Sequence, residues 1–118
     1  MNEVYDLHRP HEPIPGYPHA PADWNEQEAV NLAHEENLKL SADHLEVLRA
    51  LQEYFSRHEL HDVNARELHD ALDEKFHVKG GMRYLYVLFP GGPIAQGCRL
   101  AGLPTPTGAV DLSFGSVQ

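Results

Sequence analysis

Apolar residues recur three or four positions apart along much of the chain, which is the spacing of one face of an α-helix. Three helices are expected to start after Asn25, Ser41 and Asn64, because asparagine and serine side chains are good N-caps. The first helix would bury an apolar side made of Ala29, Val30, Leu32 and Ala33. The pattern therefore predicts a mainly α protein.

The second half of the chain adds two shorter apolar segments. Residues 82–89 are apolar almost throughout, and their periodicity fits a helix or a strand equally well. Pro93 suits the first turn of a short helix that continues through Cys98 and Leu100 and stops at Gly102. The core predicted from all these segments consists of Leu45, Leu48, Leu51, Phe55, Leu68, Leu72, Phe76, Leu85, Leu88 and Phe89.

Prolines mark both ends of the chain. The prolines between residues 8 and 23 exclude a regular helix, so residues 1–22 are expected to form an extended lead segment with a short β-hairpin near Val4 and Tyr17. Beyond Pro104 and Pro106 little holds the chain down, and residues 103–118 are interpreted as a flexible C-terminal arm and extension. Residues 1–118 are predicted to form a single domain.

The composition is that of an ordinary globular protein, with 42% hydrophobic and 23% charged residues among 118. The longest apolar stretch is far too short to span a bilayer, and the first residues lack the basic start and apolar run of a secretory signal. Cys98 is the single cysteine, so no disulfide can form within the chain. These features predict a cytoplasmic protein without a membrane partner.

Charge is distributed unevenly around a net value of −9 at pH 7. The segment 75–110 contains no acid, and its four cations either keep it soluble or form a docking face for an acidic partner; they are Lys75, Lys79, Arg83 and Arg99. DNA binding is a lesser alternative, because the helix after Asn64 carries Arg66 together with four carboxylates that phosphates would repel. The aromatic run 84–89 is interpreted as core and not as a platform for stacking bases.

Candidate chemistry is sparse. Nine histidines suggest a metal site, but there is no HExxH motif and no cysteine pair, so they are interpreted as solvent-facing side chains, and neither a metal nor a cofactor is predicted. Cys98 is the remaining reactive candidate. A lone cysteine is usually a small buried residue, and near the end of its helix Cys98 gains nothing from the helix dipole. Arg99 could favour the thiolate modestly if the two side chains share a surface.

A specific order of residues begins at Gly81. The string GMRYLYVLFP fills positions 81–90, followed by GP at 92–93, Gln96, Cys98 and AGLP at 101–104. Earlier matches are Trp24, the SADH string at 41–44, and Arg66 with Leu68. Over residues 22–110 the chain resembles the DsrC/TusE family of sulfur-relay proteins. The resemblance implies a small orthogonal bundle of about five helices with a short N-terminal β-hairpin and a mobile C-terminal arm.

The resemblance also implies a mechanism. Full members carry sulfur as a persulfide on a cysteine of the arm, and a second, inner cysteine ends the helix after the LFP turn. They present that sulfur to sulfite reductase, to DsrEFH-type or TusBCD-type sulfurtransferases, or to the tRNA-thiolating enzyme. Cys98 matches the inner cysteine, whereas Ala109 stands in place of the arm cysteine. Sulfur transfer needs a thiolate nucleophile, and a methyl group cannot accept sulfane sulfur.

Two hypotheses follow. The first is a docking or regulatory module in sulfur-relay or sulfite-reductase-type pathways, which is at most a component of a sulfurtransferase and not an enzyme by itself. Its partner-binding surface would include Lys79, Arg83, Arg99 and Arg66. The alternative is a sulfur carrier or redox sensor that uses Cys98 alone, through a persulfide or a disulfide between two chains.

Overall fold

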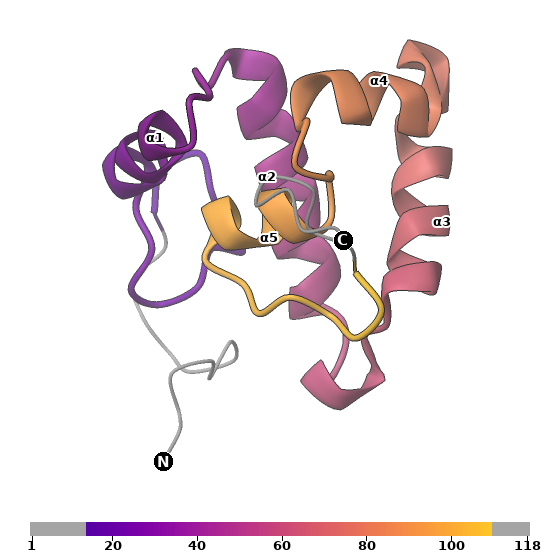
Figure 1. Ribbon diagram of the computed structural model, residues 1–118. Helices are drawn as coiled ribbons and strands as arrows, with labels where there is room; N and C mark the ends of the chain where they lie inside the picture. The colour runs from indigo at the N-terminus through magenta and orange to yellow at the C-terminus, as the bar shows by residue number, and fades with distance from the viewer. Residues whose placement is uncertain (1–13, 110–118) are drawn as a thin grey trace.

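Five α-helices make up most of the computed structural model, which describes residues 14–109 (Figure 1). They are α1 (Glu26–Glu35), α2 (Ala42–Ser56), α3 (Ala65–Lys75), α4 (Gly81–Leu88) and α5 (Ala95–Ala101). Two 3₁₀ turns, η2 (Leu60–Asp62) and η3 (His77–Lys79), precede α3 and α4. The predicted α class and the number of about five helices are confirmed.

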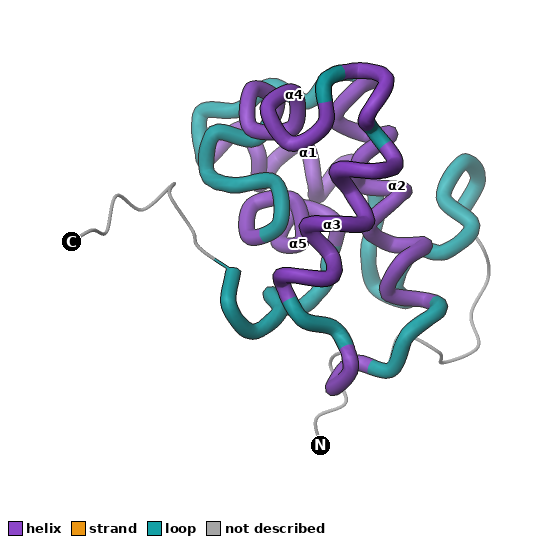
Figure 2. Tube along the Cα trace, turned by 90° about the vertical axis from the view of Figure 1, so that its right-hand side faces the viewer, coloured by secondary structure: helices purple, strands orange, loops and turns teal. Residues whose placement is uncertain are grey.

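Helix α2 is the centre of the bundle. Helix α5 packs against α2, α1 packs against α5, and α3 and α4 pack together on the other side (Figures 1 and 2). Gly97 permits the close approach of α5, because a Cβ atom there would lie only 2.8 Å from Cδ1 of Leu51. This contact places Cys98, Leu100 and Ala101 in the interior.

The three expected helix starts are confirmed. The side chains of Asn25 and Asn64 each accept a hydrogen bond from the backbone N–H three residues further along, at 2.8 and 2.9 Å. Ser41 and His44 form a reciprocal capping box at the start of α2. His44 Nε2 also donates to the carbonyl oxygen of Leu88 at 2.7 Å, which ties the start of α2 to the end of α4. His44 is thus buried and structural, contrary to the expectation that the histidines face solvent.

Residues 82–89, which fitted a helix or a strand, belong to α4 and its C-cap. Gly80 and Gly81 have φ angles of 123° and 63°, in the region that favours glycine, and reverse the chain after η3. The backbone N–H of Met82 donates to Oδ1 of Asp73 at 2.9 Å. Asp73 lies on α3, so the start of α4 is capped by the preceding helix.

The interpretation of the whole 84–89 run as core is wrong, because α4 buries only one face. Leu85 and Phe89 are buried, whereas Tyr86 and Val87 are 44% and 74% exposed. A helix at the edge of a small bundle packs against other helices on one face only, and the side chains of its opposite face remain exposed to solvent.

Most of the predicted core is confirmed, with exceptions at the edges. Leu45 and Leu88 are partly buried and pack against the core without being enclosed by it. On α1 only Ala29 and Ala33 are buried, while Val30 and Leu32 are 37% and 36% exposed. The expected four-residue apolar side was too wide, since α1 contacts α5 and buries only its two alanines.

The lead segment reaches the core through aromatic residues. Ile14 and Tyr17 form one isolated antiparallel bridge. Val4 lies outside the described residues, so the hairpin stays a prediction. The ring of Tyr17 packs edge-on against Trp24 with centroids 4.7 Å apart, and Trp24 Nε1 donates to the carbonyl oxygen of Leu100 at 2.8 Å. These contacts attach the lead segment to α5.

Candidate functional site

Cys98 occupies the inner face of α5 and is fully buried. Burial raises the pKa of the Cys98 thiol to about 12, because a thiolate in this apolar interior would lose its hydration. At neutral pH the thiolate, which is the reactive form, is therefore scarce. The position of Cys98 is that of a packed core residue.

Arg99 does not support a thiolate at Cys98. Its Nη2 and Nε atoms donate to Oε1 and Oε2 of Glu36, at 2.9 and 3.2 Å. Glu36 Oε1 also accepts a hydrogen bond from Nε2 of the buried Gln96 at 2.9 Å. Oε1 of Gln96 in turn accepts from the backbone N–H of Gly91 at 2.9 Å. Arg99 thus belongs to a network that joins α1, α5 and the turn before α5.

The C-terminal arm lies against the start of α3. The backbone N–H of Ala65 donates to the carbonyl oxygen of Thr107 at 3.1 Å, and Asn64 and Thr107 form a parallel bridge. Gly108 has a φ angle of 94°, and Ala109 N–H donates to the carbonyl oxygen of Pro106 at 3.2 Å. This turn holds Ala109 half-buried against the core. Residues 103–109 of the predicted flexible arm (103–118) are therefore held against the fold as far as Ala109, and residues 110–118 lie outside the described part.

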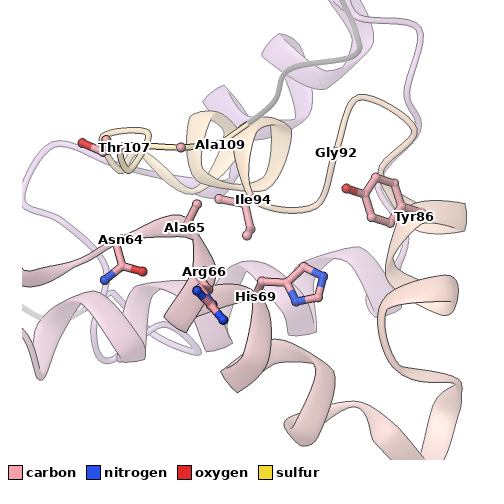
Figure 3. Close-up of a pocket in the computed structure, with 10 residues that line it drawn as sticks. Asn64, Ala65, Arg66, His69, Tyr86, Gly92, Ile94, Thr107 and Ala109 are labelled. Carbon is pink, nitrogen blue, oxygen red and sulfur yellow. The ribbon is translucent and has the colours of Figure 1, made fainter.

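An open groove of about 510 Å³ is lined by this arm, α3, α4 and the turn before α5. Figure 3 shows the side chain of Ile94 pointing into the space between the arm and α3, with Tyr86 at one end. We call this space the arm groove. Its lining residues are Asn64, Ala65, Arg66, His69, Tyr86, Gly92, Ile94, Thr107, Gly108 and Ala109.

The four predicted cations differ in whether the chain itself supplies an acidic partner. Arg66 lines the arm groove, and Arg83 is exposed on α4 one turn before Tyr86. Lys79 lies with Nζ 3.1 Å from Glu46 Oε1, and this hydrogen bond raises the pKa of Lys79. Arg99 is engaged by Glu36, as described above. Within residues 14–109 neither Arg66 nor Arg83 has a carboxylate partner, so these two cations are free to meet a partner.

Several residues of this region were not identified from the sequence. Glu36, which holds Arg99, lies more than sixty positions away from it, and no local pattern connects the two. Tyr86 had a signal, because Arg83, Tyr86 and Val87 stand three and four positions apart on one helical face. Among the described residues no group of three or more His, Cys, Asp or Glu side chains could hold a metal ion. No described helix has the length and apolar character needed to cross a membrane.

Comparisons with known proteins assign the class. The family model described as DsrC-like protein matches residues 13–110. The TusE sulfurtransferase of Salmonella typhimurium is 41% identical over 92 residues, which cover 77% of this chain and 84% of that protein. The TusE sulfurtransferase of Escherichia coli K12 is 39% identical with the same coverage. This chain belongs to the DsrC/TusE family.

A solved structure agrees with this assignment. The NMR structure of Allochromatium vinosum DsrC is 40% identical and superposes with a TM-score of 0.61, covering 75% of this chain and 79% of that chain. The resemblance seen in the sequence is therefore confirmed for both the family and the fold.

Proposed function

We propose that this chain works in a sulfur relay as a partner-docking and regulatory member of the DsrC/TusE family, without the carrier chemistry of an arm cysteine. Similarity to sulfurtransferases named TusE supports the relay as the pathway. The observation that carries the finer proposal is the methyl group of Ala109 at the arm position. A sulfur carrier needs a thiolate at this point to form a persulfide.

The burial of Cys98 supports a docking role over a carrier or sensor that uses Cys98 alone. The thiol is fully enclosed by α5 and its neighbours, and its pKa is raised to about 12. A donor polysulfide would need α5 to separate from α2 before it could reach the sulfur atom. The chain is thus not proposed to be an enzyme by itself.

We infer that the partners are cytoplasmic proteins of sulfur metabolism, namely a sulfite-reductase-like complex or DsrEFH-like or TusBCD-like sulfurtransferases. Arg66 and Arg83 are exposed and have no carboxylate partner among residues 14–109, so they can pair with acidic groups of such a protein. Lys79 and Arg99 already have acidic partners within the chain and contribute less. An acidic surface on the partner would complement these free cations.

The structure also argues against the DNA-binding alternative. Helix α3 would have to present Arg66 to phosphates, yet Glu67, Asp70 and Glu74 are exposed on the same helix. Carboxylates close to a phosphate backbone repel it and cancel the attraction of one arginine.

Sulfur loading tests the missing carrier chemistry. The native protein is incubated with inorganic polysulfide and weighed intact by mass spectrometry. In a carrier, the thiolate attacks a polysulfide sulfur, a new S–S bond forms, and the shortened polysulfide leaves. We expect no added sulfur on the wild-type chain and one added sulfur on the Ala109→Cys variant, because only that variant offers an accessible thiol.

Two further variants complete this test. Ala109→Ser is the matched control and should remain unmodified, since a hydroxyl does not form a persulfide. Cys98→Ala shows whether any sulfur on the wild-type chain resides on Cys98. Rapid sulfur uptake by folded wild-type protein at Cys98, followed by transfer to an acceptor, would overturn the proposal.

Partner binding tests the docking role. Titration calorimetry with a purified TusBCD-type sulfurtransferase should show a complex with the wild-type chain. Arg66→Glu and Arg83→Glu should each weaken it at least about tenfold, because charge reversal places like charges together. Arg57→Glu is the control, since Arg57 is exposed at the end of α2 and pairs with Glu53. Equal weakening by all three variants, or no binding by the wild-type chain, would contradict the assignment of this surface.

A further inference from the structure

The arm groove is open, partly apolar and adjacent to the last described residue of the arm. Ile94 and Ala65 contribute apolar walls, and Tyr86 leaves 44% of its surface in solvent. Ala109 itself lines the groove (Figure 3). We propose that residues 110–114 of this chain fill the arm groove and cover the surface beside Arg66. This inference concerns the chain's own extension and goes beyond the sulfur-relay proposal.

The first support is the path of the chain. The bridge between Asn64 and Thr107 fixes the arm beside α3, and the turn at Gly108 leaves Ala109 at the groove. The described part of the chain therefore ends beside the groove. A segment that is tethered at the site has a high effective concentration there, because little loop entropy is lost when it docks.

The second support is the sequence of the extension. Val110, Leu112 and Phe114 alternate with Asp111 and Ser113. In an extended segment alternate residues point to opposite sides, so the three apolar side chains would share one face. Burying that face against the exposed ring of Tyr86 and the small exposed part of Ile94 would remove apolar surface from water. The five residues can extend over about 16 Å at roughly 3.3 Å each.

The third support is charge. Arg66 lies in the first turn of α3, at the positive end of the helix dipole, where a cation is unfavourable. Within residues 14–109 it has no carboxylate partner. Asp111 is the only acid after Glu74 and is the second residue beyond Ala109. Asp111 would lie on the solvent side of this extended segment, and Arg66 is exposed, so its carboxylate at the rim of the groove would interact favourably with the guanidinium group and with the start of α3.

Solution NMR of the full chain tests the docking directly. We expect nuclear Overhauser contacts between the side chains of Leu112 or Phe114 and those of Ile94 or Tyr86, together with backbone order parameters for residues 110–114 above the roughly 0.6 that marks flexible backbone. Random-coil shifts and no such contacts for residues 110–114 would overturn the proposal.

A peptide competition identifies the occupant. A synthetic peptide with the sequence of residues 110–116 is titrated into the wild-type chain and into the double variant Leu112→Ser, Phe114→Ser. The double variant should bind the peptide in the groove at least about tenfold more tightly than the wild-type chain, because its own segment no longer competes. Ser113→Ala changes the opposite face of the segment and should behave as the wild type does.

Two results of the competition would contradict the proposal. Equal peptide binding by the wild-type chain and the double variant would mean that the groove is free and serves a segment of another protein. Absence of peptide binding to either would mean that the groove does not recognise this sequence. Both results leave the sulfur-loading test of Ala109 unaffected, so the two proposals fail separately.

Discussion

The surroundings of α5 and the arm groove contain similar residue types that are used differently. Around α5, Arg99 is held by Glu36, Gln96 links Glu36 to Gly91, and Trp24 donates to a carbonyl oxygen of the helix. At the arm groove, Arg66 has no carboxylate partner within residues 14–109, and Tyr86 is half exposed. Arg99, Gln96 and Trp24 thus find their hydrogen-bond partners inside the bundle, whereas Arg66 and Tyr86 face solvent or a segment beyond the described residues.

This difference shows why charge alone did not indicate which cations have a partner inside the chain. Arg99 and Arg83 lie in the same acid-free segment of the sequence, yet only Arg83 is free of an acidic partner among the described residues. A cation with an internal carboxylate contributes to the fold, and its exchange for a neutral residue disturbs that fold. A cation without one contributes little to stability and is the better candidate for recognition.

The largest expected effect comes from truncation in the interior. Leu48 is completely buried on α2, and Leu48→Ala should lower the free energy of unfolding by about 2–5 kcal/mol, since it removes apolar contacts and leaves a cavity. Val87→Ala on the exposed face of α4 is the control and should change it by less than about 0.5 kcal/mol. Urea denaturation measures both, and similar losses would mean that the interior and the exposed face are not distinguished in solution.

The burial of Cys98 should make the free energy of unfolding decrease at alkaline pH. The thiol pKa is about 12 in the folded chain and 9.0 by reference, so the unfolded chain releases the proton first as pH rises. The contribution of the buried, protonated thiol to the free energy of unfolding is complete below pH 9 and declines as the pH rises above 9. Between neutral pH and about pH 10.5 this group alone removes about 2 kcal/mol from the free energy of unfolding.

Cys98→Ala isolates this contribution. The variant keeps the tyrosines, which also titrate at high pH, and lacks the thiol. Its free energy of unfolding should therefore fall less steeply with pH than that of the wild-type chain over the same range. Parallel pH profiles of the two proteins would show that Cys98 is accessible to water in the folded state.

An intermediate effect is expected at Glu36. Glu36→Ala should cost about 1–3 kcal/mol, because it leaves Arg99 and the buried Gln96 without their shared acceptor. Glu35→Ala, at the neighbouring exposed position of α1, is the matched control and should cost less than about 0.5 kcal/mol. Thermal or chemical denaturation distinguishes them, and equal costs would contradict a structural role for the Arg99 network.

The smallest effect, of opposite sign, is expected at Arg66. Arg66→Gln should leave the free energy of unfolding unchanged or raise it by about 0.3 kcal/mol, since it removes a cation from the positive end of α3. Arg83→Gln should change stability by less than about 0.5 kcal/mol for lack of an internal partner. A loss above about 1 kcal/mol at either position would place that arginine among the residues that hold the fold.

Local chemistry predicted where most helices start. Asn25, Ser41 and Asn64 cap their own helices by accepting a hydrogen bond from the backbone N–H three residues further along. Such short-range caps can be predicted from the sequence. The start of α4 could not be predicted in this way, because the backbone N–H of Met82 is capped by Asp73 of the preceding helix. The periodicity of residues 82–89 therefore could not distinguish a helix from a strand.

Tertiary neighbours decided the rest. The exposure of Val30 and Leu32 depends on how narrowly α1 meets α5, and the engagement of Arg99 depends on Glu36, which is distant in the sequence. The arm position was predicted at Ala109 from family resemblance, but the groove beside it is lined by the arm, α3, α4 and the turn before α5 together. No single segment carries a pattern for such a space.

Trp24 is the only tryptophan of the chain, and its indole N–H donates a hydrogen bond to the carbonyl oxygen of Leu100 in α5. Its environment changes if the segment that contains Tyr17 and Trp24 separates from that helix, because the ring then enters water. The intrinsic fluorescence of Trp24 therefore reports on the contact between Trp24 and α5 without an added dye. A red shift of the emission before the global loss of helical circular dichroism would reveal a partly opened state in which the N-terminal segment alone has detached.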